Sequence, residues 1–291
     1  MSITSTIKTV FLLTALTVLL VLLGGALGGV AGLIIAFAIA LAMNFIAYWF
    51  SDSIALTMAG AKPVSEEDAP QLHQLVEELA LLARVPKPKV YRIESDSPNA
   101  FATGRDPNHA AIAVTTGIMR LLNREELKGV LSHELSHVRN RDTLVMTIVA
   151  TLAGAITMLA QMGQWALIFG GFGRDRDDRD GGGLAGLIVG LIMIILAPIA
   201  AMLIQLAISR AREYGADETG ARILGDPLPL ASALEKLEKG VQQKPLDVNP
   251  AASHLFIVNP LKGEWVASLF STHPPIKDRV DRLRRLIITL R

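Results

Sequence analysis

Two histidines and a glutamate stand at a spacing that suits metal-assisted hydrolysis. The stretch reads His133-Glu134-Leu135-Ser136-His137. Residues four apart lie on one face of a helix, so His133 and His137 could hold one Zn²⁺ ion while Glu134 acts as a general base toward water. Chance placement of this pattern somewhere in 291 residues has an expectation of roughly 0.005. Two solvated helix histidines are the alternative, but the pattern favours a hydrolase.

An acidic pair further along the chain could complete such a site. Glu213 and Asp217 are four residues apart on an expected helix. If Glu213 is the third zinc ligand, Asp217 lies one turn further on, where it can accept a hydrogen bond from a ligating imidazole. Two charges on a helix surface are the alternative. Because the chain has no cysteine, any metal must be held by histidine and carboxylate.

Another histidine stands where the backbone is constrained. His273 is followed by Pro274 and Pro275. Two prolines fix the chain direction, which suits a side chain that must point into a cleft. We expect His273 to stabilise the oxyanion of the transition state, with a buried structural histidine as the alternative.

The segment 97–104 is small and polar, with one aromatic residue. It lies between two expected strands, 90–93 and 110–115. The segment is either a connecting loop or a cleft wall at which an extended peptide adds as a strand. In the second interpretation, the substrate-binding residues are Asn99, Ala100 and Phe101.

The composition is too apolar for an ordinary soluble protein. Hydrophobic residues make up 51% of the chain, charged residues 19%, and the mean hydropathy is +0.42. The formal net charge is +1, so no long-range field favours nucleic acid as a partner. We therefore expect a protein that resides in a lipid bilayer.

Residues 10–50 contain no Lys, Arg, Asp, Glu or His. One straight helix of that length would run about 60 Å, twice the hydrocarbon core of a bilayer. The run is therefore expected to form two spans, 7–23 and 30–49, with a break in the glycine cluster between them. A cleaved signal peptide is the competing interpretation, but the apolar run is too long for one.

Two further apolar segments, 143–172 and 184–208, each exceed the roughly 20 residues that a span needs. A core helix pair of a soluble fold is the alternative. Two crossings between His137 and Glu213 would leave both on one side, and flanking Lys and Arg residues indicate that this side is cytoplasmic. The expected division is a membrane hairpin at 1–50, a first catalytic part at 51–142, a second hairpin at 143–208 and a second catalytic part at 209–291.

Helices are also expected around the candidate site. Apolar periodicity predicts helices at about 66–83 and 228–239 and a basic helix from Ile276. The helix of the two histidines should begin at a capping box formed by Asn123 and Glu126. One arginine cluster is expected to be a solvated helix face near anionic lipid: Arg279, Arg282, Arg284 and Arg285.

Four motifs together resemble the HtpX-type membrane zinc metalloproteases, relatives of the prenyl-protein (CAAX) endopeptidases. In family order they are Pro98-Asn99-Ala100-Phe101-Ala102, His133-Glu134-Leu135-Ser136-His137, Ser209-Arg210-Ala211-Arg212-Glu213-Tyr214-Gly215-Ala216-Asp217 and Ser271-Thr272-His273-Pro274. The resemblance covers essentially the whole chain. It implies that His133, His137 and Glu213 are zinc ligands. It also implies that Glu134 is the catalytic acid and base.

The resemblance further implies an endopeptidase of the bacterial inner membrane that degrades misfolded or damaged membrane proteins. The expected fold is an α-helical polytopic membrane protein with four transmembrane helices and a mainly α, zincin-like α+β metalloprotease domain in the cytoplasm. One zinc ion per chain is the expected cofactor. The lipid bilayer and unfolded membrane proteins are the expected partners, and the sequence gives no oligomeric state.

Two other functions stay open. Processing of prenylated peptides, as by the CAAX endopeptidases, would differ only in substrate, although those enzymes have more spans than the four expected here. A catalytically inactive membrane scaffold could keep a structural metal. Glu134 argues against the scaffold, because a purely structural site has no use for a base beside an open coordination position.

Overall fold

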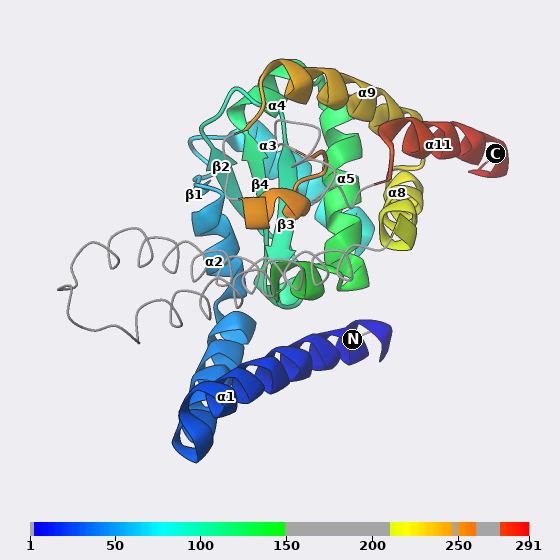
Figure 1. Ribbon diagram of the computed structural model, residues 1–291. Coiled ribbons are helices and arrows are strands. Elements are labelled where there is room, and N and C mark those ends of the chain that lie inside the picture. Colours follow the sequence, from blue (N-terminus) through cyan, green and yellow to red (C-terminus); the bar gives the residue numbers. More distant parts are fainter. Residues whose placement is uncertain (1–2, 149–209, 247–249, 260–273, 291) are drawn as a thin grey trace.

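A computed structural model describes residues 3–148, 210–246, 250–259 and 274–290. Figure 1 shows a bent N-terminal helix that leads into a body in which helices surround a small sheet. Most of the second expected hairpin, 143–208, lies outside the described residues, as does His273. The described residues therefore include the elements of the body that carry the candidate site. They also include the first hairpin.

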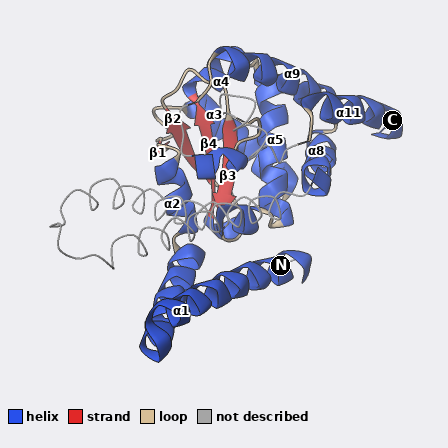
Figure 2. Cartoon of the chain, viewed as in Figure 1, coloured by secondary structure: helices blue, strands red, loops and turns tan. Residues whose placement is uncertain are grey.

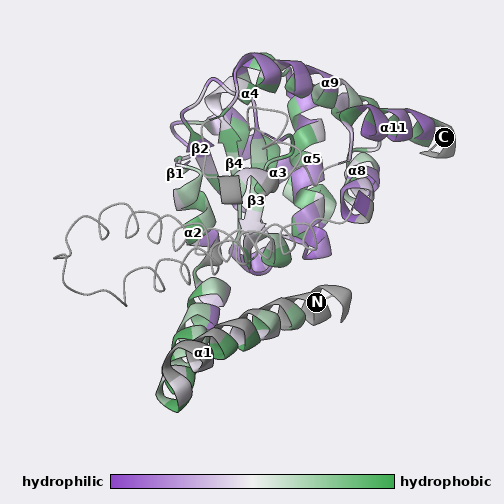
Figure 3. Ribbon diagram, in the orientation of Figure 1, coloured by the Kyte–Doolittle hydropathy of each residue, from purple (hydrophilic) through white to green (hydrophobic). Residues whose placement is uncertain are grey.

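Helix α1 (Ile3–Trp49) folds back on itself within its glycine cluster (Figure 1). Gly29 has a φ of +57°, a left-handed conformation that glycine adopts at little cost. The two arms contact each other, since Asn44 Nδ2 donates to Thr17 Oγ1 at 2.8 Å. Among the described residues, Gly29–Trp49 is the one helix long and apolar enough to cross a bilayer. Figure 3 shows apolar residues along both arms.

A four-stranded sheet lies at the centre of the body (Figure 2). Its strands, in spatial order, are β1 (Lys62–Pro63), β2 (Lys89–Ile93), β4 (Ala110–Thr115) and β3 (Ala100–Gly104). Strands β2 and β4 run parallel, while β3 is antiparallel to β4. The strands expected at 90–93 and 110–115 are present. The segment 97–104 contains an edge strand, not only a loop.

Helix α5 (Arg124–Asn140) carries both histidines of the motif. It begins at the expected capping box: the Asn123 side chain accepts from the Glu126 N–H at 2.9 Å, and the Glu126 carboxylate accepts from the Asn123 N–H at 3.0 Å. It ends at Arg141, whose φ is 61°. Around it pack α3 (Pro70–Ala83), α8 (Arg210–Leu224), α9 (Leu228–Gln243) and strand β3.

Two glycines allow this close packing on α5. A Cβ at Gly129 would lie 2.6 Å from the backbone nitrogen of Leu230 in α9. A Cβ at Gly220, in α8, would lie 3.0 Å from the backbone nitrogen of His133. Helix α8 therefore runs almost in backbone contact with α5. That proximity brings its acidic side chains to the histidines.

Helix α11 (Ile276–Leu290) begins where the sequence predicts and packs on α8 and α9. The expectation that its arginines are all solvated is wrong for Arg279, which is 0% exposed. Arg279 shares the buried helix face with Val280 and Leu283, and these three residues lie three, four and seven positions after Ile276. An arginine is tolerated on that face because the carboxylates of Asp217 and Glu213 lie next to its guanidinium and balance the charge.

The remaining described elements are short, and the sequence analysis did not predict them. They are α2 (Ser51–Met58), α4 (Thr116–Leu121) and the 3-10 helices at Pro107–His109 and Pro250–Leu255. Helix α2 follows α1 and packs against strands β3 and β4, so it lies between the apolar hairpin and the sheet.

Candidate metal centre

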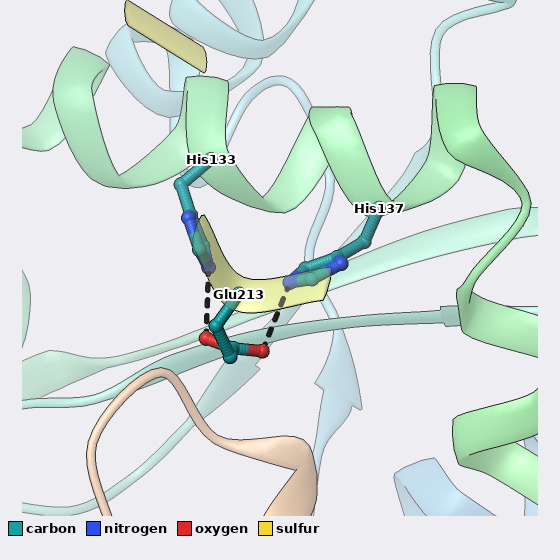
Figure 4. Close-up of side chains that lie close together, drawn as sticks. All are labelled: His133, His137 and Glu213. Atoms are coloured by element: carbon teal, nitrogen blue, oxygen red, sulfur yellow. Dashed lines mark ion pairs between the residues drawn. The ribbon is translucent and has the colours of Figure 1, made fainter. Parts of the chain in front are cut away.

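His133, His137 and Glu213 converge at one point between α5 and α8 (Figure 4). His133 Nε2 lies 3.7 Å from Glu213 Oε2, and His137 Nε2 lies 3.5 Å from Glu213 Oε1. All three side chains are buried. One ligand atom from each lies within 4.8 Å of the other two.

The donor set and its spacing fit a zinc ion. Ligand atoms bound tetrahedrally to zinc at 2.0–2.2 Å would be about 3.4 Å apart. Each imidazole nitrogen has one Glu213 oxygen near this distance, Oε1 at 3.5 Å from His137 and Oε2 at 3.7 Å from His133, and one ligand atom from each residue lies within 4.8 Å of the other two. Two imidazoles and one carboxylate are the ligand set of hydrolytic zinc sites, which keep a fourth position open for water or substrate.

A carboxylate lies behind each imidazole. His133 Nδ1 is 2.9 Å from Asp217 Oδ1, and His137 Nδ1 is 3.4 Å from Asp142 Oδ2. With a metal on Nε2, each Nδ1 carries the hydrogen and donates it to its carboxylate, which sets the orientation of the ring. Asp217 thus lies behind the His133 ring, in the position expected of it if His133 binds a metal through Nε2.

Asp142 is a residue that the sequence analysis missed. It follows Arg141, the residue in left-handed conformation that ends α5, and its N–H donates to the His137 carbonyl at 2.9 Å. This turn brings a side chain from beyond the helix back toward the histidine five residues earlier. An acidic residue directly after the end of the histidine helix was the feature of the sequence that could have indicated a partner for His137.

The two histidines differ in their electrostatic surroundings. Burial lowers the pKa of His133, and the Arg279 guanidinium adds to this, although Asp217 opposes both. For His137, burial is outweighed by Asp142 and Glu213, which raise its pKa to about 10. A metal-free centre therefore holds a proton on His137 that a metal must displace.

Glu134 lies on the side of α5 that faces β3, and its carboxylate accepts a hydrogen bond from the backbone N–H of Ala102. Burial raises its pKa to about 8, with a smaller rise from Glu213, while His137 lowers it. A raised pKa makes a carboxylate a stronger base. A divalent cation nearby would lower the value again.

A buried arginine reaches this centre from α11. Arg279 donates to both carboxylate oxygens of Asp217, at 2.9 and 2.7 Å, and its Nη1 lies 3.5 Å from Glu213 Oε2. This role was not predicted, because the basic cluster that contains Arg279 is typical of a solvated helix face. Arg279 lies on the same helix face as the apolar residues Ile276, Val280 and Leu283, and this spacing indicates a buried position.

The proposed substrate-binding residues lie at the start of β3 with buried side chains. Asn99 Nδ2 donates to the Val258 carbonyl at 2.7 Å, and the Phe101 ring packs edge-on against Phe256 with centroids 5.0 Å apart. Ala100 accepts a hydrogen bond from the Ile257 N–H at 3.0 Å through its carbonyl. A role for these residues in substrate binding stays a prediction, as does the role of His273.

Residues 66–287 match the model of Peptidase family M48. A "Protease HtpX homolog" from Aquifex aeolicus (strain VF5) is 58% identical over 268 residues, covering 92% of this chain and 88% of the relative. Another, from Pyrococcus furiosus, is 55% identical over 285 residues and covers 98% and 96%. The crystal structure of S. mikatae Ste24p matches with a TM-score of 0.53 at 18% identity, covering 97% of this chain and 66% of that one. At that identity the likeness shows the fold alone.

Proposed function

Because the chain belongs to peptidase family M48 and is, like its relatives, a membrane zinc metalloprotease, we propose that it cleaves misfolded or damaged membrane proteins as an endopeptidase. One observation carries the catalytic part of the proposal. A buried glutamate, Glu134, lies beside a cluster of two imidazoles and a carboxylate that fits zinc, next to the edge strand of a sheet.

The proposed reaction is hydrolysis by direct attack of water. Zinc, when bound to His133, His137 and Glu213, supplies a Lewis acid that acidifies water and polarises a carbonyl. Glu134 takes the proton of the attacking water and then delivers it to the leaving amine. The Ala102 N–H holds the Glu134 carboxylate in position for both transfers. We propose His273 as a further donor to the oxyanion.

Substrate would bind in extended form along β3. An edge strand offers backbone groups for pairing with a peptide. On β3 the Ala100 carbonyl and the Ala102 N–H are already bonded to Ile257 and Glu134, so pairing would use the other groups of this edge. Strand β3 contacts α5 and supplies the Ala102 N–H to Glu134, so a peptide on this edge would lie next to the base. Asn99, Ala100 and Phe101 are the proposed substrate-binding residues.

We propose four membrane spans, with the two arms of α1 as the first pair and segments 143–172 and 184–208 as the second. Side chains along α1 support this, since Val30 is 77% exposed and Ile34 61% exposed, as lipid-facing residues would be. The Arg105 guanidinium stacks on the Trp49 ring at 4.7 Å, at the end of α1. Tryptophan and arginine are typical of a membrane interface.

The proposed location is the bacterial inner membrane, with the body in the cytoplasm. This keeps the proposed division into hairpins at 1–50 and 143–208 and catalytic parts at 51–142 and 209–291. Arg139 and Arg141 flank the second hairpin on the side of the body. Basic residues next to spans favour the cytoplasmic side.

The test is an assay on the full chain, purified in detergent with zinc. An unfolded membrane protein, casein and a prenylated peptide are offered as separate substrates, and the Glu134→Gln variant serves as control. Cleavage of the unfolded proteins by the unmodified chain alone supports the proposal. Cleavage of the prenylated peptide alone would replace it with prenyl-peptide processing, and zinc binding without any cleavage would leave the inactive scaffold.

A further inference from the structure

Arg279 is the largest side chain that is fully buried in the part of the chain that the structure describes. A guanidinium stays charged at any physiological pH, so it is buried only where other groups replace its water shell. The surroundings of Arg279 supply such groups from several segments. Their identity connects the arginine to the metal centre.

The guanidinium binds Asp217 through two parallel hydrogen bonds. Nε donates to Oδ2 at 2.9 Å and Nη2 donates to Oδ1 at 2.7 Å. Oδ1 is the same oxygen that lies 2.9 Å from His133 Nδ1. A bidentate pair fixes the plane of a carboxylate as well as its position. Arg279 and His133 thus share one oxygen of Asp217, and Arg279 Nη2 itself lies 3.4 Å from both ring nitrogens of His133.

The remaining edge of the guanidinium reaches two more groups. Nη1 donates to the Ile257 carbonyl at 3.1 Å and lies 3.5 Å from Glu213 Oε2. The N–H of Ile257 in turn donates to the Ala100 carbonyl of β3 at 3.0 Å. One side chain of α11 therefore connects α8, the histidine helix and the segment that lies along the edge strand.

Arg279 also balances part of the negative charge that is buried around the metal centre. Four buried carboxylates lie at or next to the two imidazoles: Glu134, Asp142, Glu213 and Asp217. The described cations among them are Arg279 and Arg212, which interacts with Asp142 and Glu213. Two guanidiniums and one divalent ion balance four carboxylates. Removal of Arg279 would leave one buried negative charge unbalanced. That charge would repel the neighbouring carboxylates, which must stay in place to hold the metal.

We propose that Arg279 is a positioning residue of the metal centre, which holds Asp217 against His133 and Glu213 in its ligating place. Zinc affinity therefore depends on α11, although α11 carries no ligand. The guanidinium fork is what makes this possible, because a lysine ammonium cannot bind both oxygens of Asp217 and also reach the Ile257 carbonyl. The inference rests on the metal centre and is independent of the substrates proposed above.

The test compares Arg279→Lys with Arg284→Lys in the full chain. Arg284 is an exposed residue of the same helix, bonded to Glu235 at 2.8 Å, so its variant is a matched control for charge and helix. Zinc affinity is measured by competition with a chromogenic chelator, and circular dichroism verifies folding. We expect Arg279→Lys to bind zinc about 10- to 100-fold more weakly, and Arg284→Lys to bind it normally.

A spectroscopic measurement distinguishes a change in the geometry of the metal ligands from a general loss of stability of the fold. In the protein loaded with Co²⁺, Arg279→Lys is expected to change the visible absorption bands, which report ligand geometry, while Arg284→Lys leaves them unchanged. A folded Arg279→Lys protein with normal zinc affinity and normal cobalt bands would overturn the proposal. Both readouts work without a substrate, so they are unaffected if the substrate proposal fails.

Asp217→Asn covers the case in which Arg279→Lys does not fold. The proposal holds that Arg279 acts through Asp217, so this near-isosteric variant must also weaken zinc binding. Where both variants fold, the double variant should lose less affinity than the two single variants together, because Arg279 acts partly through Asp217 and partly on Glu213. Normal affinity in Asp217→Asn, or fully additive losses in the double variant, would contradict the proposal.

Discussion

His137 Nδ1 lies 3.4 Å from Asp142 Oδ2, although the helix that carries the histidine ends before the aspartate. The contact exists because Arg141 turns the chain back in left-handed conformation. Asp142 thereby has the same relation to His137 as Asp217 has to His133. Each proposed imidazole ligand thus has its own carboxylate.

Asp142→Asn should therefore weaken zinc binding by about 10- to 100-fold, because the amide is a poorer acceptor for the Nδ1 hydrogen. Chelator competition measures this. Asp106→Asn is the control, since Asp106 lies 2.9 Å from His109 Nδ1 on the exposed surface. Equal affinities in the two variants would show that Asp142 does not support the centre.

Glu134→Gln should keep its zinc and lose activity by about 10²- to 10⁴-fold, because the amide keeps the size of the side chain but cannot accept a proton. Elemental analysis gives the bound zinc, and hydrolysis of an unfolded substrate gives the rate. Substantial activity in a zinc-loaded Glu134→Gln protein would exclude Glu134 as the base.

Glu126→Gln should destabilise the body by about 1 kcal/mol, because the amide loses the ion pair with Lys236 at 2.8 Å and has one acceptor oxygen where the carboxylate uses two, for the Asn123 N–H and the Ser232 hydroxyl. Burial raises the pKa of Glu126, but Lys236, Ser232 and the Asn123 N–H together lower it further, so the net shift is downward. A carboxylate with a lowered pKa stabilises the fold above its ordinary pKa, and the contribution disappears as the pH falls through the lowered value.

The melting temperature of Glu126→Gln should therefore lie below that of the unmodified chain at pH 7, and the gap should close toward pH 3. Glu125→Gln serves as the comparison, because Glu125 is an exposed neighbour on the same turn. A gap that is equally wide at both pH values would mean that the charge of Glu126 contributes nothing.

Gly220→Val should weaken zinc binding and lower the melting temperature together. A Cβ at this position already lies 3.0 Å from the His133 backbone, so a branched side chain must push α8 away from α5. Glu213 would then retreat from the histidines. Gly215→Ala is the matched control in the same helix, since a Cβ there meets nothing within 4 Å. Normal zinc affinity in Gly220→Val would show that the centre tolerates separation of the helices.

The parts of the fold that follow local rules could be predicted from the sequence. The capping box at Asn123 and Glu126 begins α5 as expected, and strand β4 covers the expected residues 110–115. The spacing of His133 and His137 needs only a helix to bring both onto one face. Their meeting with Glu213 required a second inference, the assumption that the intervening chain returns α8 to α5.

The parts that depend on tertiary contacts could not be predicted in this way. Arg279 looks like its exposed neighbours in the sequence, and its burial is explained by distant partners: Asp217, Glu213 and the Ile257 carbonyl. Asp142 depends on a single backbone turn at Arg141. The edge strand β3 has small residues that suit a loop equally well, and its pairing with β4 decides the matter.

The order of protein synthesis gives the buried arginine a further consequence. Ribosomes make Arg279 146 residues after His133 and 62 residues after Asp217. If the centre needs this arginine as proposed, a nascent chain with all three ligands already translated still cannot hold its metal firmly. The protease would then bind its metal firmly only late in its own biogenesis, and fragments released before α11 would have little proteolytic activity.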